Sequence, residues 1–278
     1  MRVAYLGPAG THSEEALRAS APDGAEEVPC PTIYDAVMAV QQGAADRAVV
    51  PIENALEGGV AVTLDTLVLE AADVRIGAEL VHPIHHCLIA AEPLDLASVR
   101  RVVSHPQAIA QCARFLRERL PHAEHVSAPS TAEAVASLRG ADGSTAALGT
   151  RLAADLYGCE LIAADVEDHP DNATRFVWLA PAAAVREPDG PAKTTIVFWG
   201  AGDEAPGWLV DVLGELASRD VNLTRIESRP RRIRLGHYMF VADLEGAASL
   251  PPVSDALAAL GAHVEEVRVL GSYGASPG

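Results

Sequence analysis

The chain contains a single lysine, Lys193, among its 278 residues. Lysine is the side chain that forms Schiff bases with carbonyl substrates and that reaches the phosphates in nucleotide-binding loops. Because none lies in the first 180 residues, both kinds of chemistry are excluded there. Nothing else in the sequence indicates a cofactor, so we expect none.

Cysteines and long apolar runs are also scarce. Cys30, Cys87, Cys112 and Cys159 show neither paired spacing nor a metal-ligand pattern, so we expect reduced, mostly buried thiols and no metal. No uncharged run approaches the roughly 20 residues that a membrane span needs. Residues 1–7 resemble a buried strand entering a glycine turn and not a signal peptide. We therefore expect a cytoplasmic protein that does not contact a membrane.

Basic residues are outnumbered, with 21 Lys and Arg against 38 Asp and Glu, giving a formal net charge of −17. This balance disfavours nucleic acid and anionic membranes as partners, since both need a basic face. A carboxylate substrate would have to be attracted locally, by Arg, backbone amides and helix N-termini.

Short apolar runs alternate with amphipathic segments over residues 1–180, which is typical of α/β units. Strands are expected at residues 3–6, 47–50, 75–90 (long or broken), 99–103, 123–126 and 146–148. Helices are expected at residues 12–19, 33–42, 61–71, 106–120, 131–138 and 151–157. Thr11 with Glu14, and Ser130 with Glu133, fit capping boxes at two of the helix starts.

A segment rich in Ala and Pro at residues 181–192 is a good linker. Beyond it, residues 193–273 show the order strand, helix, strand, strand, helix, strand. The expected elements lie at residues 194–199, 207–218, 223–228, 237–243, 253–260 and 264–270. The order βαββαβ is that of a ferredoxin-like module.

Three polar stretches each follow a predicted strand, where α/β sheets bind ligands. Residues 7–13 include Thr11 and Ser13 and open a helix, whose N–H groups suit an anion; a plain turn capped by Thr11 is the alternative. Residues 50–59 include Asn54, which can donate and accept hydrogen bonds at once. Glu53 and Glu57 in the same stretch could form an acid–base pair, but carboxylates would repel an anionic substrate.

Residues 104–112 form the third stretch and contribute Ser104 and Gln111. Ser104 beside His105 suggests a hydrolase, yet adjacent residues rarely point together and no Gly-x-Ser-x-Gly elbow is present. His82, His85 and His86 suggest a metal site at first sight. His85 and His86 would face opposite sides of a strand, and no acidic ligand follows at a helpful spacing, so structural or exposed histidines are favoured.

Residues 172–176, Asn-Ala-Thr-Arg-Phe, place a hydroxyl beside a guanidinium. Thr174 could give a proton to a leaving oxygen, and Arg175 offers a rigid fork of donors suited to a carboxylate. Together they suggest elimination of a hydroxyl group from a small carboxylic acid. A surface strand with no role in chemistry is the alternative for so short a stretch.

The strings GPAGTHS, VPIENALEGGV, SHPQAIAQC, STAEA and NATRF occur in one order and at spacings that resemble prephenate dehydratase. The string NLTRIESRP, followed by Tyr-Met-Phe-Val, resembles the ACT regulatory domain that such enzymes carry. The resemblance runs from about residue 3 to residue 270. One short string is unspecific, but several in the same order are highly specific.

The resemblance implies two α/β lobes of the periplasmic-binding-protein type over residues 1–180, with the chain crossing between them twice and the substrate in the cleft. It implies conversion of prephenate to phenylpyruvate, water and carbon dioxide without a metal or cofactor. The catalytic residues would be Thr174, Asn54, Ser104 and Gln111. Thr174 would either donate the proton or position and polarise the leaving group. Thr11, Ser13, Arg175 and Phe176 would contact the substrate or support the cleft.

The resemblance further implies feedback inhibition by phenylalanine at an interface between ACT domains, in a homodimer or homotetramer that also uses the catalytic domains. The effector would be bound by Gly207, Asn222, Glu227, Ser228 and Arg229. Trp208 departs from the small residue that usually follows that glycine, so the indole would either fill or reshape the pocket, or enter the domain core. Ala55 also departs, because a serine is usual there.

Three other functions fit parts of the sequence. Arogenate dehydration and prephenate decarboxylation without loss of the hydroxyl would both use the same fold, and Thr174 argues against the second. A non-catalytic amino-acid sensor would have no reason to keep a polar group for a departing hydroxyl.

Overall fold

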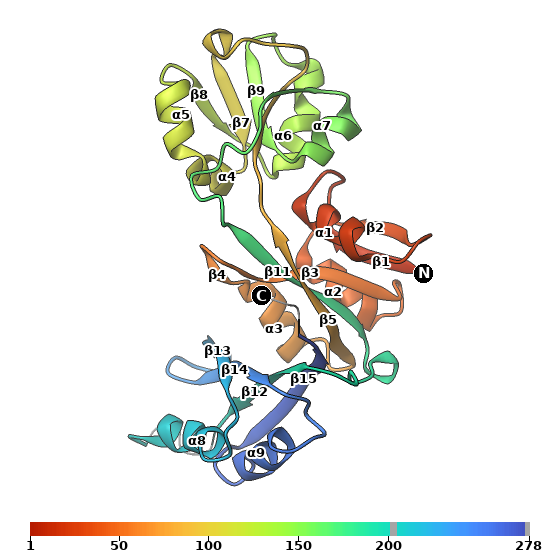
Figure 1. The fold of residues 1–278 in the computed structure, drawn as a ribbon, viewed down its shortest axis with the longest axis vertical. Helices are drawn as coiled ribbons and strands as arrows, with labels where there is room; N and C mark the ends of the chain where they lie inside the picture. The colour runs from red at the N-terminus through yellow and green to blue at the C-terminus, as the bar shows by residue number, and fades with distance from the viewer. Residues whose placement is uncertain (201–204, 276–278) are drawn as a thin grey trace.

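The computed structural model describes residues 1–200 and 205–275. Three α/β units follow one another along the long axis of the molecule (Figure 1). Lobe 1, residues 1–83 and 173–181, lies in the middle. Lobe 2, residues 87–163, lies at one end, and the C-terminal domain, residues 192–274, lies at the other.

Lobe 1 is built on one mixed sheet with the strand order β2-β1-β3-β11-β5. Its strands are β1 (Arg2–Leu6), β2 (Glu26–Cys30), β3 (Arg47–Asn54), β4 (Gly58–Gly59), β5 (Val74–Pro83) and β11 (Ala173–Pro181). Its helices are α1 (His12–Ser20), α2 (Ile33–Gln41) and α3 (Ala61–Leu69). Strand β1 runs parallel to β2 and β3, while β11 returns late in the chain and pairs antiparallel with both β3 and β5.

Lobe 2 has a second sheet with the order β10-β6-β9-β7-β8. Its strands are β6 (Cys87–Ala90), β7 (Arg101–Ser104), β8 (Glu124–Ser127), β9 (Thr145–Gly149) and β10 (Glu160–Ala163). Its helices are α4 (Pro106–Gln111), α5 (Ala113–Arg119), α6 (Thr131–Ser137) and α7 (Arg151–Tyr157), with 3₁₀ turns at Leu96–Ser98 and Leu138–Gly140.

The expected elements agree with this architecture in order and differ in detail. The long strand expected at residues 75–90 is broken into β5 and β6, and residues 84–86 between them form the first crossing from lobe 1 to lobe 2. Residues 164–172 form the return crossing. The helix expected at residues 106–120 is two helices, because the backbone of Cys112 leaves the helical region with φ −112° and ψ 17°. Strands β2, β4, β10 and β11 were not among those expected, although a strand was considered as the alternative for residues 172–176, where β11 begins.

The C-terminal domain is a four-stranded antiparallel sheet with the order β13-β14-β12-β15. Its elements are β12 (Ala192–Trp199), α8 (Trp208–Ala217), β13 (Leu223–Pro230), β14 (Tyr238–Glu245), α9 (Val253–Leu260) and β15 (Glu266–Gly274). The predicted βαββαβ order and the two-lobed α/β architecture before it are confirmed. A 3₁₀ turn at Ala182–Ala184 lies between β11 and β12.

Both faces of the C-terminal sheet are covered. One face, with Ile196 and Phe198, packs against Val212 and Leu216 of α8 and against α9. The opposite face, with Val197, Met239 and Tyr273, joins a single apolar core with residues of lobe 1. The sheet is therefore enclosed between its own helices and the first lobe, so the two domains share buried apolar surface.

The contact between the domains requires a glycine on β15. A Cβ at Gly271 would lie 2.3 Å from the carbonyl oxygen of Ile76 on β5, whereas a Cβ at Gly274 of the same strand would meet nothing within 4 Å. Backbone therefore lies directly on backbone at this point of the interface.

We expect Gly271→Ala to lower the free energy of unfolding by about 1–3 kcal/mol, because overpacking forces the two strands apart. Gly274→Ala is the matched control and should change it by less than about 0.5 kcal/mol. Urea denaturation of the two variants beside the parent protein measures the difference. Equal midpoints for both variants would show that the interface yields without cost.

Candidate active site

A cleft of about 680 Å³ lies between lobes 1 and 2. Lobe 1 contributes Thr11, Asn54 and Thr174 to its lining, and lobe 2 contributes Gln111 and Ser130. The volume falls within the range of roughly 300–1,000 Å³ that small-molecule sites occupy. Of the eight residues predicted to act on the substrate, Thr11, Ser13, Asn54, Gln111, Thr174 and Phe176 line this one cleft.

Thr174 and Asn54 are direct register partners on β11 and β3. The Asn54 side-chain amide donates a hydrogen bond to Thr174 Oγ1 over 2.9 Å, and its oxygen accepts from the backbone N–H groups of Leu56 and Glu57. The amide is therefore locked in one orientation. Because Thr174 Oγ1 already accepts from Asn54, its own proton is left for an acceptor in the cleft.

Gln111, at the end of α4, is held by the return crossing and by a histidine. Its Oε1 lies 2.9 Å from Nε2 of His86 and 3.4 Å from Nδ2 of Asn172. Burial, with the nearby His12 as a second cause, lowers the pKa of His86 to about 4. His86 is thus a neutral imidazole that donates to Gln111. The sequence analysis did not predict His86 as a cleft residue, because it considered His86 only together with His82 and His85 as a possible metal site.

The first turn of α1 lines the cleft with Thr11, His12 and Ser13. Thr11 is its N-cap: Oγ1 accepts from the N–H of Glu14 and donates to the carbonyl of Leu6. The Thr11 hydroxyl therefore acts as the cap that the plain-turn interpretation expected. Binding of an anion by the remaining free N–H groups of the turn stays a prediction.

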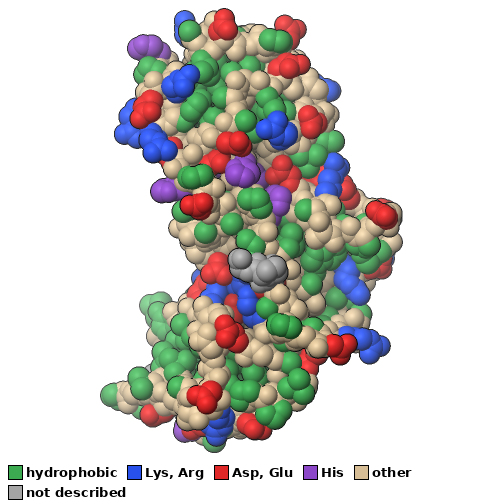
Figure 2. Space-filling model, in the orientation of Figure 1, with side chains coloured by type: hydrophobic (Ala, Val, Ile, Leu, Met, Phe, Trp, Pro, Cys, Tyr) green, Lys and Arg blue, Asp and Glu red, His purple; other side chains and the backbone are tan. Residues whose placement is uncertain are grey.

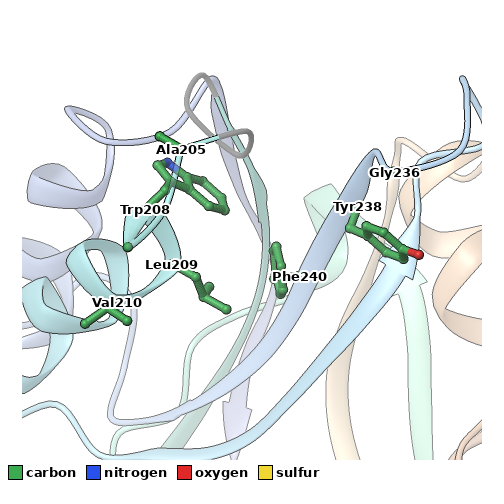
Figure 3. A pocket seen from close by; sticks show the side chains of 8 residues that line it. Ala205, Trp208, Leu209, Val210, Gly236, Tyr238 and Phe240 are labelled. Atoms are coloured by element: carbon green, nitrogen blue, oxygen red, sulfur yellow. The ribbon is translucent and has the colours of Figure 1, made fainter.

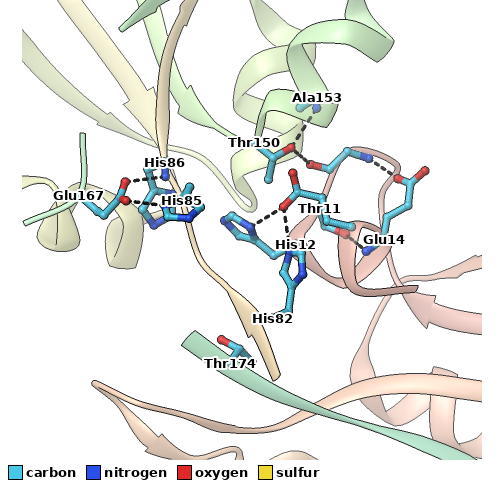
Figure 4. Close-up of polar contacts among 12 residues, drawn as sticks. Thr11, His12, Glu14, His82, His85, His86, Thr150, Ala153, Glu167 and Thr174 are labelled. Atoms are coloured by element: carbon cyan, nitrogen blue, oxygen red, sulfur yellow. Dashed lines mark hydrogen bonds and ion pairs between the residues drawn. The ribbon is translucent and has the colours of Figure 1, made fainter. Parts of the chain in front are cut away.

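Lobe 2 directly contacts the loop that precedes α1, as Figure 4 shows for Thr150. Thr150 Oγ1 donates to the carbonyl of Gly10 over 2.8 Å, and the Tyr157 hydroxyl donates to that of Ala9 over 2.8 Å. Gly10 has φ +91°, and a Cβ there would lie 2.9 Å from Cβ of Ala153. Only glycine allows this approach of the two lobes.

The prediction that Ser104 contacts the substrate needs correction. Its side chain is fully buried, and Oγ donates to the carbonyl of Leu148 on the neighbouring strand β9 over 2.8 Å. Ser104 therefore stabilises the lobe 2 sheet behind the cleft.

Arg175 was predicted to contact the substrate or to support the cleft, and the first of these alternatives is wrong. Successive side chains of a strand point to opposite faces, so Thr174 and Phe176 face the cleft while Arg175 faces away from it. Its guanidinium pairs with carboxylates of Glu53, Glu79 and Asp243. The strand itself is central to the sheet, so the surface-strand alternative is wrong as well.

Carboxylates from distant parts of the chain lie beside His82 and His85. Glu15 Oε2 is 2.9 Å from Nδ1 of His12 and 3.5 Å from Nε2 of His82. Glu167 Oε1 is 2.7 Å from Nδ1 of His85, with Asp165 nearby. Burial opposes ionisation of Glu15, but hydrogen bonds from His12 and His82 lower its pKa to about 2. The sequence argument that no acidic group accompanies these histidines is therefore corrected, because it considered only neighbours along the chain.

Both groups have ligand atoms close enough together to hold a metal ion. In each, however, the carboxylate already hydrogen-bonds to an imidazole (Figure 4). The Thr174 and Asn54 pair belongs to neither group.

The residues predicted to bind an effector are separated in the C-terminal domain. Gly207 lines a pocket of about 210 Å³ with Trp208, Leu209 and Phe240 (Figure 3). Ser228 is the register partner of Phe240, and Asn222 is exposed. Glu227 and Arg229 lie on the opposite face of β13, where Arg229 forms a bidentate ion pair with Asp65 of α3 in lobe 1. The Arg229 side chain is therefore corrected to a contact between domains, while Glu227 pairs with Arg225 of its own strand.

The Trp208 indole both borders the pocket and packs on the domain core, so it follows neither of the alternatives for this residue alone. Its Nε1 donates to the carbonyl of His263 over 2.7 Å, and its ring centroid is 5.9 Å from that of Phe240 and 6.3 Å from that of Phe198. The indole therefore packs on the domain core while lining the pocket, and it leaves the pocket open.

The fold and the cleft define a two-lobed α/β ligand-binding unit followed by a ferredoxin-like domain. The prephenate dehydratase family model matches residues 3–184, and the ACT domain model matches residues 194–262. The chain belongs to the prephenate dehydratase family and carries an ACT domain. No helix among the described residues is long and apolar enough to cross a membrane.

Similar proteins cover nearly the whole chain. A prephenate dehydratase from Amycolatopsis methanolica is 38% identical over 100% of this chain and 90% of its own length. Arogenate dehydratase 4 from Arabidopsis thaliana is 37% identical over 98% of this chain and 67% of its own length. The crystal structure of a prephenate dehydratase from Arthrobacter aurescens in complex with L-Phe gives a TM-score of 0.90 at 38% identity, covering 100% of this chain and 92% of that one. A quorum-quenching acylase, GqqA, gives 0.89 at 34% identity, covering 100% and 99%.

The low pKa of His86 leads to a prediction about stability. His86 stays neutral in the folded state, whereas in the unfolded state its imidazole binds a proton below pH ~6.5. The contribution of His86 to the free energy of unfolding is therefore complete above pH ~6.5 and is lost as the pH falls toward 4. Between pH 7.5 and pH 5 this loss amounts to about 2 kcal/mol of unfolding free energy. His86→Gln should remove this part of the pH dependence. Urea denaturation of both proteins at the two pH values checks it, and parallel pH slopes would contradict it.

Proposed function

We propose that the cleft binds prephenate and converts it to phenylpyruvate, carbon dioxide and water, as a carbon–oxygen lyase. The observation that carries this proposal is the pair Asn54 and Thr174, in which a fixed amide orients a hydroxyl whose proton is free toward the cleft. The family membership of the chain supports it.

The reaction needs one proton and no external oxidant. Carbon dioxide leaves with its bonding electrons retained by the ring, the bond from the ring to its hydroxyl oxygen breaks, and the ring becomes aromatic. The dianionic substrate gives a monoanionic product, so one proton is consumed in making water. Thr174 would donate it to the leaving oxygen and regain it from solvent, or would polarise that oxygen while water supplies it.

The carboxylates of the substrate would be held without a cationic side chain from lysine or arginine, since neither type occurs among the described residues that line the cleft. The available donors are the free N–H groups in the first turn of α1, the side chains of Ser13, Gln111 and Ser130, and imidazoles such as His105. Short-range donors of this kind suit a chain whose overall charge of −17 repels anions.

Thr174→Ala should lower kcat by about 10²–10⁴-fold, the usual contribution of a general acid. Thr174→Ser keeps the hydroxyl and is the matched control, so it should retain most of the activity. Phenylpyruvate formation is followed by its enol absorbance in base. A loss of less than about tenfold for Thr174→Ala would end the catalytic role of this residue.

The same assay separates the alternatives. Faster turnover of arogenate than of prephenate would assign the chain to the reaction of its plant relative. Consumption of prephenate without phenylpyruvate would indicate decarboxylation alone, and no consumption of either substrate would indicate an amino-acid sensor.

We further propose that phenylalanine is the effector of a homodimer or homotetramer formed through the ACT and catalytic domains. The pocket at Gly207 is lined by aromatic and aliphatic groups, which suits an aromatic side chain. The L-Phe complex of the Arthrobacter enzyme supports this proposal. The cytoplasmic location remains a prediction from the sequence.

Millimolar phenylalanine should inhibit phenylpyruvate formation, whereas alanine at the same concentration should not, because it cannot fill an apolar pocket. Initial rates at several prephenate concentrations measure the effect. Equal rates with the two amino acids would contradict the proposal that phenylalanine is the effector.

A further inference from the structure

Arg175 lies between two cleft residues on β11 but extends to the opposite face of the sheet, toward the C-terminal domain. Figure 2 shows acidic and basic side chains gathered where this domain meets lobe 1. We call the ion-paired side chains of Arg175, Glu53 and Glu79 from lobe 1, with Lys193, Arg225 and Asp243 from the C-terminal domain, the interface cluster.

Asp243 is the member of the interface cluster that ties Arg175 to the C-terminal domain. Its Oδ2 lies 2.6 Å from Nη2 of Arg175, which also pairs with Glu53 at 3.0 Å. The side chain of Asp243 is 1% exposed and that of Arg175 is 9% exposed. Burial alone would lower the pKa of Arg175, but the Asp243 carboxylate raises it above its ordinary value. The two charges therefore depend on each other.

The C-terminal domain fixes the position of Asp243. Thr195 on β12 donates a hydrogen bond to Asp243 Oδ1 over 2.7 Å, and the Thr195 hydroxyl also contacts that of Tyr273 on β15 at 2.7 Å. All three strands involved, β12, β14 and β15, belong to one sheet. The Asp243 carboxylate, which pairs with Arg175, is thus held in place by the sheet of the C-terminal domain.

The interface cluster lies on the face of the lobe 1 sheet opposite to Thr174 and Asn54. Thr174 faces Asn54 in the strand register, and the next register pair is Arg175 with Glu53. The first pair faces the cleft, while the second contributes two members of the interface cluster. A backbone shift at Arg175 or Glu53 therefore has only one peptide unit to cross to reach Thr174 or Asn54.

We propose that Asp243 is a positioning residue for the reaction, which holds the Thr174 hydroxyl and the Asn54 amide in place through Arg175 and Glu53. This inference rests on the proposed function, since it concerns the geometry of the same site. It places one determinant of turnover in a domain of which no described residue lines the cleft. Displacement of the C-terminal sheet, by an effector or by mutation, would be transmitted to the cleft along this path.

The test uses Asp243→Asn in the full-length protein, with phenylpyruvate formation as the readout. We expect kcat to fall about tenfold, because small misplacements of reacting groups cost this much or more, and the KM for prephenate to change less than twofold. Asp65→Asn is the matched control. Asp65 is also a buried partner of arginines across the same interface, Arg229 and Arg232, but its helix α3 supplies no side chain to the cleft. It should leave kcat unchanged.

A second readout separates positioning from a merely structural role. In the Thr174→Ala background there is no hydroxyl to position, so adding Asp243→Asn should change kcat less than twofold. A structural defect would lower kcat by the same factor in both backgrounds. That result, or a parent-like kcat for Asp243→Asn alone, would overturn the proposal.

Thr195→Val covers the case in which Asp243→Asn does not fold. It removes the hydrogen bond that fixes Asp243 and retains the charge, so kcat should fall two- to threefold with KM unchanged, whereas an unchanged kcat would count against the proposal. Turnover of prephenate by the parent protein tests the proposed function separately. If it does not turn over prephenate, both proposals fail, whereas normal parent turnover with unaffected variants rejects only the role of Asp243.

Discussion

The insertion of β11 between β3 and β5 is the constraint on which the rest of the structure depends. This strand returns from lobe 2 after the second crossing and pairs antiparallel with both neighbours over most of its length. Its alternation sends Thr174 to the cleft and Arg175 to the C-terminal domain. One strand therefore closes the lobe 1 sheet, joins the two lobes and connects the cleft to the second domain. A register slip of one residue would exchange the two faces and lose all of these relations.

The distribution of charge follows from the strongly acidic composition. Arginines that could have lined the cleft are instead engaged behind it, where Arg175 and Arg225 meet Glu53 and Asp243. Buried ion pairs gain little net stability but are costly to break singly, so they fix relative positions more than they stabilise the fold. The described residues that line the cleft offer neutral donors and imidazoles, together with one carboxylate, that of Glu133. Such a site recognises an anion by directed hydrogen bonds, which act only at short range and so tolerate an unfavourable overall field.

Local patterns in the sequence predicted the order of strands and helices and several cleft residues, whereas the two lobes with a cleft between them were implied by the family resemblance. Strand ends, glycine turns and helix caps identified Thr11, Asn54 and Gln111, and a hydroxyl beside a guanidinium in residues 172–176 identified Thr174. The sequence did not predict contacts between segments distant along the chain. The side chains of Ser104 and Arg175 are of the types that suit a substrate, but only the tertiary structure shows that Leu148 and Asp243 already bind them. The same limit applies to Glu15 beside His82, and to Arg229 beside Asp65.

The single lysine supports the view that the two domains act as one mechanical unit. Lys193 lies at the start of β12, directly after the segment that joins the domains, and its Nζ is 2.7 Å from Oε1 of Glu79 on β5. The other oxygen of that carboxylate pairs with Arg175. The point at which the C-terminal domain begins is therefore fixed to the same buried group as the strand that carries Thr174. A sheet anchored at its first strand by Lys193 and at β14 by Asp243 cannot rotate on lobe 1 without separating buried charges. Such a rotation would be expected to proceed as a switch between two paired arrangements, since intermediate positions would leave charges unpaired in a buried environment.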